Sequence, residues 1–363
     1  MTDVERLEYK AGLSVEDVKD LTGGNPVTRL SSNENPFGPS PKAIAAAQAA
    51  LETANVYPAR DDAALCSALS GFHGRGLTSS HFFAANSGVE ALSLIEDACG
   101  VADNRAIISP PCFGAYAASL KKKNAGIDIV TLKGESFAVD VDGILAAVTP
   151  ETRLVYLCNP NNPTGTWFGE DVLSGILARL PDHVTLIYDE VYFQFATEKG
   201  LPDAIRHVLD GRNIVIVHSF SKAYGLAGLR VGYGIAAPAL TKRIQQLKRP
   251  FHINAVAMSA AMAALQDDDH LNTTVRNNHD ERSVLIKGLQ ALGLKPTVSQ
   301  ANFVMFECPD GMDADSLTRA LVEQAVMVRP AFHLPRHIRA TIGTPDDNAR
   351  LLDALSGTLG GQK

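Results

Sequence analysis

The sequence predicts an α/β fold, with a mostly parallel central sheet flanked by helices and a smaller α+β domain after it. Strand and helix patterns alternate between about residues 80 and 235, as they do when helices join parallel strands. Three apolar runs, at residues 153–158, 184–187 and 214–217, have the continuous hydrophobicity of strands buried on both faces. Because parallel strands share one carboxyl edge, we expect the loops after these runs to form a site.

The other elements follow from capping and periodicity. Ser40 before Pro41 predicts the start of a helix that continues through the alanine-rich run to Ala54. Residues 240–292 have helical patterns, and residues 302–306 and 338–342 have the patterns of strands in the smaller domain. We therefore expect a large domain over residues 31–264, and a second unit formed by residues 1–30 together with 265–363.

Composition narrows the class of protein. The chain has 363 residues, 45% of them hydrophobic, and a net charge of −7, which argues against nucleic acid as a partner. It shows neither an apolar run long enough for a membrane span nor a signal-peptide pattern. The five cysteines are scattered without a Cys-x-x-Cys pair, and Pro335 separates His333 from His337. We expect a cytoplasmic protein with reduced thiols and no metal site.

Lys222 is the most informative residue of the chain. It follows the strand at residues 214–217, where burial can lower the pKa of its amine and make it a nucleophile for a Schiff base. Ser219, Ser221 and Arg230 offer donors for a phosphate. A solvated surface lysine is the plain alternative. Ser-x-x-Lys also occurs in penicillin-recognising hydrolases, but their Ser-Asp-Asn and Lys-Thr-Gly elements do not follow here. Pyridoxal phosphate, a carbonyl cofactor with a phosphate, is the interpretation that joins these features.

Asp189 and Tyr192 follow the strand at residues 184–187. A carboxylate against a pyridinium nitrogen keeps that nitrogen protonated, so that the ring can accept electrons. The Tyr192 phenol is placed to reach a neighbouring ring oxygen. Asp189 could instead cap a helix, and Glu190 could be the functional acid, although adjacent residues of an extended segment face opposite ways.

Three further segments complete the pattern. Asn162 lies in an Asn/Pro/Gly cluster after the strand at residues 153–158, a composition that also makes ordinary turns. Gly88 and Val89 begin a helix, where free N–H groups favour a phosphate, although such a junction alone is a weak signal. Phe113 lies on a loop and could stack on a flat ring or simply pack in the core.

These motifs together resemble fold-type I pyridoxal-phosphate-dependent aminotransferases. The resemblance rests on Ser-x-Ser-Lys222 with Arg230 eight residues later, on Asp189-x-x-Tyr192 and on the Asn-Asn-Pro-Thr-Gly run ending at residue 165. Residues 30–41, residues 338–344 and the Tyr-Lys-Ala-Gly opening at residue 9 resemble the histidinol-phosphate aminotransferase branch.

The resemblance implies a role for each matching residue. Lys222 would form the Schiff base, Asp189 would pair with the pyridinium nitrogen, and Asn162 and Tyr192 would hold the ring oxygen. The phosphate would lie on Ser219, Ser221, Arg230 and the Gly88–Val89 backbone, with Phe113 stacked on the ring. Tyr57 would reach the phosphate of a neighbouring subunit, which implies a homodimer. Arg339 would bind the substrate carboxylate, and Asn33 and Tyr9 would line the pocket. His252, where an asparagine is more usual, is expected near that pocket.

The expected reaction moves an amino group between histidinol phosphate, or a related donor, and 2-oxoglutarate by a ping-pong mechanism. Arg339 must then accept both a phosphate and a carboxylate, and Arg329 is a candidate second cation, unless it is a surface salt-bridge residue. Three alternatives stay open. They are an aromatic or broad-range amino-acid aminotransferase, a decarboxylase or lyase of the same fold, and a non-catalytic cofactor sensor.

Overall fold

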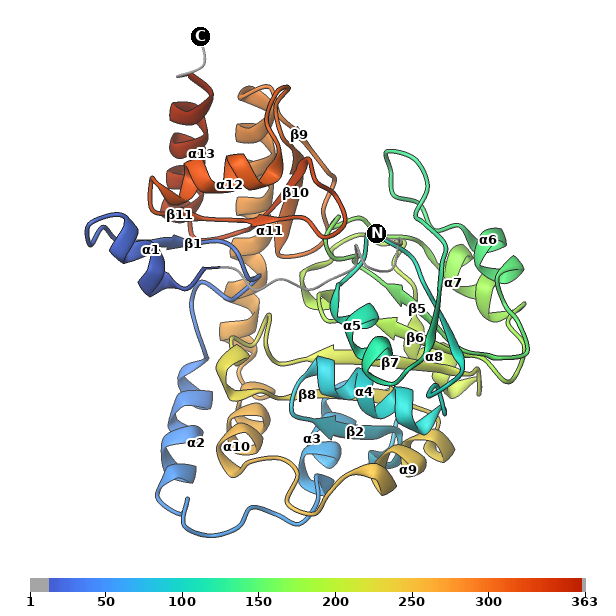
Figure 1. Cartoon of the computed structure of the whole chain (residues 1–363). Helices are drawn as coiled ribbons and strands as arrows, with labels where there is room; N and C mark the ends of the chain where they lie inside the picture. The colour runs from blue at the N-terminus through green and yellow to red at the C-terminus, as the bar shows by residue number, and fades with distance from the viewer. Residues whose placement is uncertain (1–12, 361–363) are drawn as a thin grey trace.

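A seven-stranded sheet forms the centre of the computed structural model, which describes residues 13–360 (Figure 1). Its strand order is β2-β8-β7-β6-β5-β3-β4, and the five strands from β7 to β4 are parallel. Only β8 runs antiparallel to its neighbours β2 and β7 within this sheet. The strands are β2 (Phe82–Ala85), β3 (Arg105–Ile108), β4 (Gly126–Ile129), β5 (Thr152–Cys158), β6 (Thr185–Asp189), β7 (Ile214–Ser219) and β8 (Gly232–Ala236).

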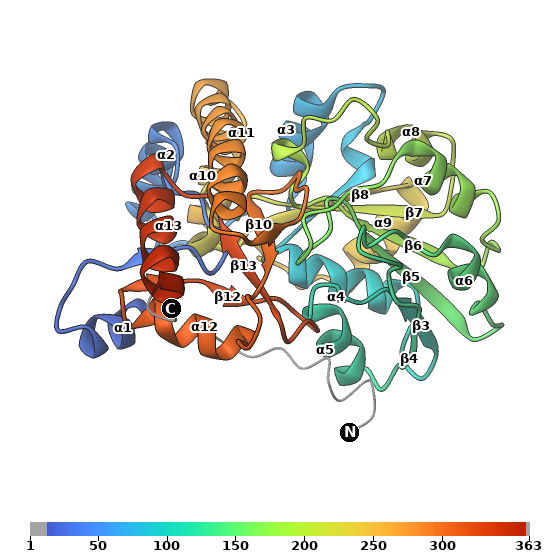
Figure 2. The ribbon, with the colours of Figure 1, turned by 90° about the horizontal axis from the view of Figure 1, so that it is seen from above.

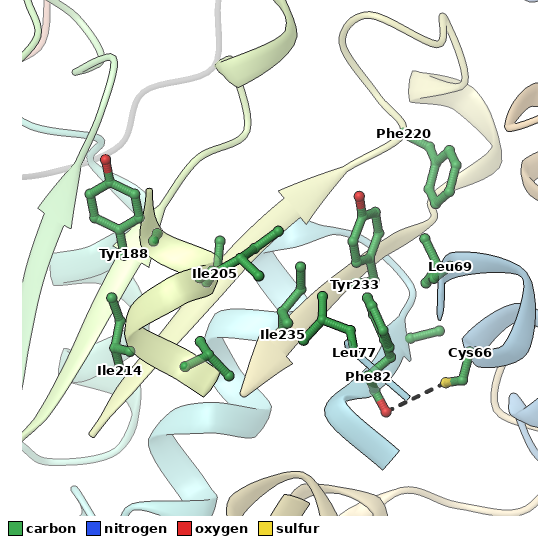
Figure 3. Close-up of a cluster of buried hydrophobic side chains, with 14 of the residues drawn as sticks. Cys66, Leu69, Leu77, Phe82, Tyr188, Ile205, Ile214, Phe220, Tyr233 and Ile235 are labelled. Atoms are coloured by element: carbon green, nitrogen blue, oxygen red, sulfur yellow. Dashed lines mark hydrogen bonds between the residues drawn. The ribbon is translucent and has the colours of Figure 1, made fainter. Parts of the chain in front are cut away.

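Helices cover both faces of this sheet (Figure 2). Successive residues of each strand contribute to different clusters: Leu186 and Tyr188 pack on one face, whereas Ile187 packs on the other. Figure 3 shows part of the first cluster, in which Phe82, Tyr233 and Phe220 lie beside Leu69 of α3. The helices are α2 (Pro41–Leu51), α3 (Ala63–His73), α4 (Gly88–Ala98), α5 (Ala115–Lys122), α6 (Val141–Ala146), α7 (Glu170–Leu177), α8 (Ala204–Leu209), α9 (Pro238–Leu247) and α10 (Ala255–Ala264), with the 3-10 turns η2 (Ser79–His81), η3 (Phe193–Phe195) and η4 (Ala227–Leu229).

A second, antiparallel sheet has the order β12-β13-β10-β9 and its own hydrophobic cluster. Its strands are β9 (Lys295–Pro296), β10 (Phe303–Glu307), β12 (Arg329–Pro330) and β13 (His337–Thr341), and its helices are α11 (Asp268–Ala291), α12 (Ala314–Val322) and α13 (Pro345–Gly360). The N-terminal segment joins this unit, because β1 (Thr28–Arg29) pairs with β11 (Val326–Met327) and Val18 of α1 (Val15–Leu21) packs against Met327.

The predicted α/β fold class is confirmed, and the apolar runs form β5, β6 and β7. The side chain of Ser40 accepts a hydrogen bond from the Ala43 N–H at the start of α2, but this helix ends at Leu51 rather than at Ala54. The next described segment contains turns and no further helix before α3. Across residues 13–360, no helix combines the length and the apolar character needed to cross a bilayer.

Candidate active site

A cavity of about 430 Å³ opens where β5, β6 and β7 end, since Cys158, Asp189 and Ser219 all line it. Its volume lies within the range of small-molecule sites. The predicted residues that line it are Asn33, Gly88, Val89, Phe113, Asn162, Asp189, Tyr192, Ser219, Ser221, Lys222, Arg230, Arg329 and Arg339. Tyr57 is described but lies elsewhere, and Tyr9 lies outside the described residues.

Lys222 is half-buried, and its Nζ donates a hydrogen bond to the Ser32 carbonyl oxygen at 3.0 Å. Burial lowers the pKa of this amine to about 8, and the nearby positive charge of Arg339 adds to the effect. Because ordinary lysines titrate near pH 10.5, Lys222 has a far larger neutral, nucleophilic fraction near pH 8 than a surface lysine. Lys222 is therefore not a solvated surface lysine, the alternative that the sequence left open.

Asp189 ends β6 with its carboxylate in the cavity, and its Oδ2 accepts a hydrogen bond from the Tyr116 hydroxyl at 2.6 Å. Burial raises the pKa of Asp189 to about 6, while the bond from Tyr116 opposes that rise. The Val191 N–H donates to Oδ1 at 3.2 Å, which is a local turn contact rather than a helix cap, because the next helical turn, η3, begins at Phe193.

Glu190, the alternative acid, does not line the cavity. Its Oε2 lies 3.0 Å from His218 Nε2, and the other ring nitrogen of His218 lies 2.8 Å from the Tyr233 hydroxyl. His218 is thus a buried histidine with polar partners, and Asp189 is the acid that reaches the cavity.

Tyr192 and Asn162 can each donate a hydrogen bond to an oxygen atom of a ligand in the cavity. The Tyr192 hydroxyl accepts a bond from Asn33 Nδ2 at 3.1 Å, so its own proton can be donated into the cavity. Asn162 Oδ1 accepts from Arg339 Nη1 at 2.8 Å, which leaves the amide nitrogen as the donor that Asn162 can offer. Arg339 Nη2 donates to the Ser31 carbonyl oxygen at 2.7 Å, so this guanidinium is held in place.

Groups that could hold an anion gather at the N-terminus of α4, and they are called the anion subsite below. The backbone of Gly88 begins the helix, and the hydroxyls of Ser219 and Ser221 and the guanidinium of Arg230 line the same cavity. Gly232 of β8 lies directly beneath this turn: a Cβ at position 232 would come within 2.7 Å of the Gly88 nitrogen. The absence of a side chain there lets the turn lie close to β7 and β8.

Aromatic rings and arginines also line the cavity. Phe113 meets Phe332 edge-on, with their ring centroids 6.0 Å apart. The guanidinium carbons of Arg329 and Arg339 lie 5.4 and 5.6 Å from the centre of the Phe332 ring. Arg329 and Arg339 are directly paired in the β12–β13 register, so both cations reach one cavity from neighbouring strands.

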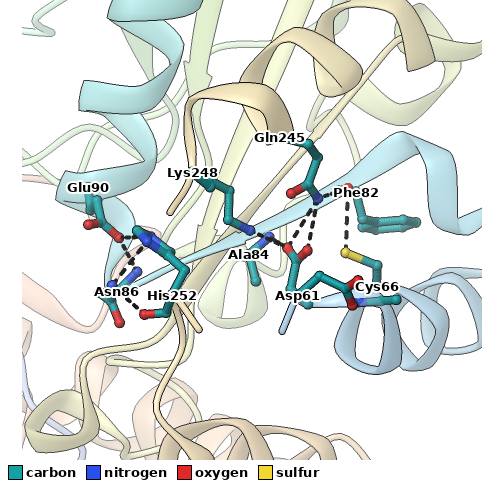
Figure 4. Close-up of polar contacts among 11 residues, drawn as sticks. Asp61, Cys66, Phe82, Ala84, Asn86, Glu90, Gln245, Lys248 and His252 are labelled. Atoms are coloured by element: carbon teal, nitrogen blue, oxygen red, sulfur yellow. Dashed lines mark hydrogen bonds and ion pairs between the residues drawn. The ribbon is translucent and has the colours of Figure 1, made fainter. Parts of the chain in front are cut away.

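His252, which was expected near the substrate pocket, does not itself line the cavity. His252 Nε2 lies 2.9 Å from Glu90 Oε2, and Asn86 Nδ2 donates to the His252 carbonyl oxygen at 3.1 Å (Figure 4). Asn86 and Glu90 lie on either side of the Gly88 turn in the sequence, so the contacts of His252 with these two residues help to hold that turn in place.

Tyr57 is 81% exposed, and its ring stacks on Phe251 with centroids 5.0 Å apart. The segment that carries Phe251 also carries Lys248, whose Nζ donates to the buried Asp62 carboxylate at 2.6 Å. Tyr57 therefore projects from an anchored surface and not into its own chain's cavity.

The residues present fit pyridoxal phosphate. They place an amine of lowered pKa, a carboxylate, two hydrogen-bond donors for a ring oxygen and a backbone anion subsite around one cavity. Sequence reasoning missed Tyr116, Ser32, Cys158 and Phe332. Tyr116 carried a usable signal, because a tyrosine on the buried face of a helix requires a polar partner for its hydroxyl.

Comparison with known proteins shows the family to which the chain belongs. Residues 25–355 match the family described as aminotransferase class I and II, and the chain belongs to that family. It is 36% identical over 353 residues to histidinol-phosphate aminotransferase 1 of Nitrosococcus oceani, covering 97% of this chain and 94% of the relative. It is also 36% identical to the histidinol-phosphate aminotransferase of Akkermansia muciniphila, covering 98% of this chain and 97% of that relative.

Solved structures extend the comparison to three dimensions. The histidinol-phosphate aminotransferase of Sinorhizobium meliloti, solved in complex with pyridoxal-5'-phosphate, superposes with a TM-score of 0.87 at 26% identity. The match covers 100% of this chain and 98% of that structure. The predicted resemblance to fold-type I aminotransferases is thereby confirmed.

Proposed function

We propose that this chain is a pyridoxal-phosphate-dependent aminotransferase that moves the amino group of histidinol phosphate to 2-oxoglutarate. The observation that carries this proposal is the pair Arg329 and Arg339, which reach the Lys222 cavity together. Histidinol phosphate carries a phosphate where glutamate carries its α-carboxylate. A pocket with two guanidinium groups can bind the dianion of the first and the monoanion of the second.

Each cavity residue has a proposed task toward the cofactor. Lys222 binds it covalently, Asp189 holds its ring nitrogen, and Tyr192 and Asn162 donate to its ring oxygen. Ser219, Ser221, Arg230 and the backbone of Gly88 and Val89 hold its phosphate, with Phe113 against the ring. Asn33 positions Tyr192 by its 3.1 Å hydrogen bond, and Tyr9 is proposed to line the substrate pocket.

Lys222 is the acid–base group of the proposed mechanism. When bound, pyridoxal phosphate supplies an aldehyde that takes up the amino group and a ring that delocalises an electron pair. The Lys222 amine, once displaced by the donor's amine, takes a proton from the donor's amine-bearing carbon. The same amine would then hold that proton within the cavity and be placed to give it up again. Burial suits Lys222 to this task, since an amine with a pKa of about 8 exchanges protons readily near neutral pH.

Arg339 and Arg329 have different proposed roles in substrate binding. Arg339, held by Asn162 and the Ser31 carbonyl, presents a fixed fork to a carboxylate or a phosphate. Arg329 lies on the neighbouring strand, with its guanidinium also over the Phe332 ring, and adds the second positive charge that a phosphate requires. Arg329 is therefore the proposed determinant of donor choice.

Replacing Arg329 with glutamine tests this assignment. Loss of one charged hydrogen bond is worth about 1.5–3 kcal/mol, so kcat/KM for histidinol phosphate should fall about 10- to 150-fold. Turnover of phenylalanine should change less than about threefold, because it lacks the phosphate. Arg336→Gln is the matched control, since Arg336 pairs with Glu307 and Asp310 outside the cavity.

A panel of amino donors against 2-oxoglutarate separates the alternatives. Equal losses for histidinol phosphate and phenylalanine in Arg329→Gln would favour an aromatic or broad-range aminotransferase. Release of carbon dioxide without amino transfer would indicate a decarboxylase of the same fold.

We also propose that the enzyme acts in the cytoplasm as a homodimer, with residues 31–264 as the large domain and residues 1–30 plus 265–363 as the second unit. Exposed apolar side chains on α2 and in nearby segments support an interface between two copies, which would bury them. They are Phe37, Ile44, Leu51, Val56, Tyr57 and Phe251. Tyr57 is proposed to cross this interface to the partner's anion subsite.

Mixing of two variant subunits tests whether Tyr57 acts across the dimer interface. Tyr57→Ala and Lys222→Ala homodimers should each be strongly impaired. If Tyr57 acts across the interface, a mixed dimer contains one site with both residues intact, and activity should recover toward half the wild-type value per dimer. No recovery in dimers shown to be mixed by mass spectrometry would contradict it.

A further inference from the structure

The Asp189 carboxylate has a buried partner that lies behind it. The Tyr116 hydroxyl from α5 donates to Asp189 Oδ2 at 2.6 Å, and both side chains are buried, with 1% and 4% exposure. Burial and the Asp189 charge hold the pKa of the Tyr116 phenol well above its usual value, so the phenol keeps its proton and always donates. The ring is fixed by edge contact with Phe113, at 5.7 Å between centroids, and by Tyr156, at 4.9 Å.

Tyr156 provides an internal comparison. Its ring lies against that of Tyr116, but its hydroxyl donates to Glu96 Oε1 at 2.8 Å. Glu96 is fully buried and also accepts from the Ser119 hydroxyl at 2.6 Å. The two neighbouring tyrosines therefore donate hydrogen bonds to two different carboxylates. Of these two, Asp189 lines the cavity and Glu96 does not.

We propose that Tyr116 is a positioning residue that keeps the Asp189 carboxylate ionised and turned toward the ring nitrogen of the bound cofactor. This inference rests on the proposed function. Without a donor, a buried carboxylate would take up the proton of the ring nitrogen, because a neutral pair is easier to bury than an ion pair. The charge-assisted bond from Tyr116 stabilises the anion, so the proton stays on the nitrogen and the ring can withdraw electrons.

Other groups also face Asp189, and all of them remain when the phenol is removed. Cys158 comes from β5, Glu190 and Tyr192 follow Asp189 along the chain, and Lys222 comes from the loop after β7. Lys222 favours ionisation of Asp189, whereas Glu190 opposes it. A difference between wild type and a variant without the phenol therefore reports on Tyr116.

Tyr116→Phe is the test, with Tyr156→Phe as the matched control that removes a neighbouring phenol from Glu96 instead. The readout is the ¹⁵N resonance of the ring nitrogen in holoenzyme loaded with ¹⁵N-labelled pyridoxal phosphate, recorded at pH 8. Wild type and Tyr156→Phe should show a protonated nitrogen, and Tyr116→Phe should show a largely unprotonated one. Cofactor affinity of the apo-protein should fall about 10- to 100-fold in Tyr116→Phe, as expected for one charged hydrogen bond, and less than about threefold in Tyr156→Phe.

Incorporation of 3-fluorotyrosine at position 116 gives a second variant that keeps the packing and strengthens the donor. It should leave the nitrogen protonated at pH 8, as in wild type, and an unprotonated nitrogen in this variant would also count against the inference. A protonated nitrogen in Tyr116→Phe, or an affinity equal to that of Tyr156→Phe, would overturn the inference. A protein that binds the cofactor as described but transfers no amino group would contradict the proposed function and leave the inference standing. Failure of wild type to bind pyridoxal phosphate would overturn both.

Discussion

Replacing Gly232 with alanine should weaken cofactor binding while leaving the fold intact. Gly232 lies in β8 beneath the first turn of α4, and a Cβ there would come within 2.7 Å of the Gly88 nitrogen and 3.0 Å of the His218 carbonyl oxygen. Both obstacles are backbone atoms, so no side-chain rotation can relieve the contact. The turn that carries Gly88 must move away from the strand.

The size of the effect follows from this geometry. Moving the Gly88 nitrogen from 2.7 Å to an ordinary contact distance of 3.4 Å displaces the turn by about 0.7 Å. Overpacking of this kind costs about 1–3 kcal/mol. If the displacement falls on the anion subsite, the dissociation constant of pyridoxal phosphate rises about 5- to 150-fold.

The assay is a titration of apo-protein with pyridoxal phosphate, followed by the visible absorbance of the complex. Gly228→Ala is the matched control, since Gly228 also lines the cavity but a Cβ there would meet nothing within 4 Å. Thermal unfolding of both apo-variants separates a local effect from a global one. Equal dissociation constants for Gly232→Ala and Gly228→Ala would refute the reasoning about the turn.

Three other predictions concern titration and support of the site. The rate at which apo-protein takes up pyridoxal phosphate should rise with pH through a midpoint near 8, the pKa of Lys222, and a midpoint near 10.5 would contradict the burial of this amine. The pKa of Asp189 is about 6 in the fold and 3.8 ordinarily, so wild-type apo-protein should lose up to about 3 kcal/mol of stability between pH 4 and pH 6, as the buried group ionises. Asp189→Asn should remove that loss, which urea unfolding at pH 4.5 and pH 8 would detect, and an unchanged loss would assign it to another group. His252→Ala should weaken cofactor affinity by no more than about fivefold, because its pair with Glu90 is partly exposed, and a hundredfold loss in the same titration would mean that His252 does more than brace the turn.

The sequence was most informative where chemistry follows a buried strand. Asp189 ends a buried strand, and Lys222 and Asn162 lie in the loops that follow two others; parallel strands bring such residues to one edge whatever the helices do. Their convergence could therefore be predicted without knowing a single long-range contact. The position of Arg339 depended on resemblance instead, since it comes from a different sheet.

Contacts between elements far apart in the sequence could not be predicted from the sequence. The bond between Tyr116 and Asp189 depends on how α5 is rotated against the sheet, and the place of His252 depends on the path of a loop between two helices. The single reversed strand β8 was also missed, because a strand buried on both faces has the same apolar pattern in either direction. These are features of packing and not of local pattern.

The central claim is that Lys222 is the amine that carries the cofactor. The most direct test is reduction of the holoenzyme with borohydride, followed by proteolysis and mass spectrometry, which locates the cofactor on a single lysine. The account predicts the added mass on Lys222 and its absence, together with loss of the visible absorbance, in Lys222→Ala. Added mass on another lysine of the wild-type protein would contradict it.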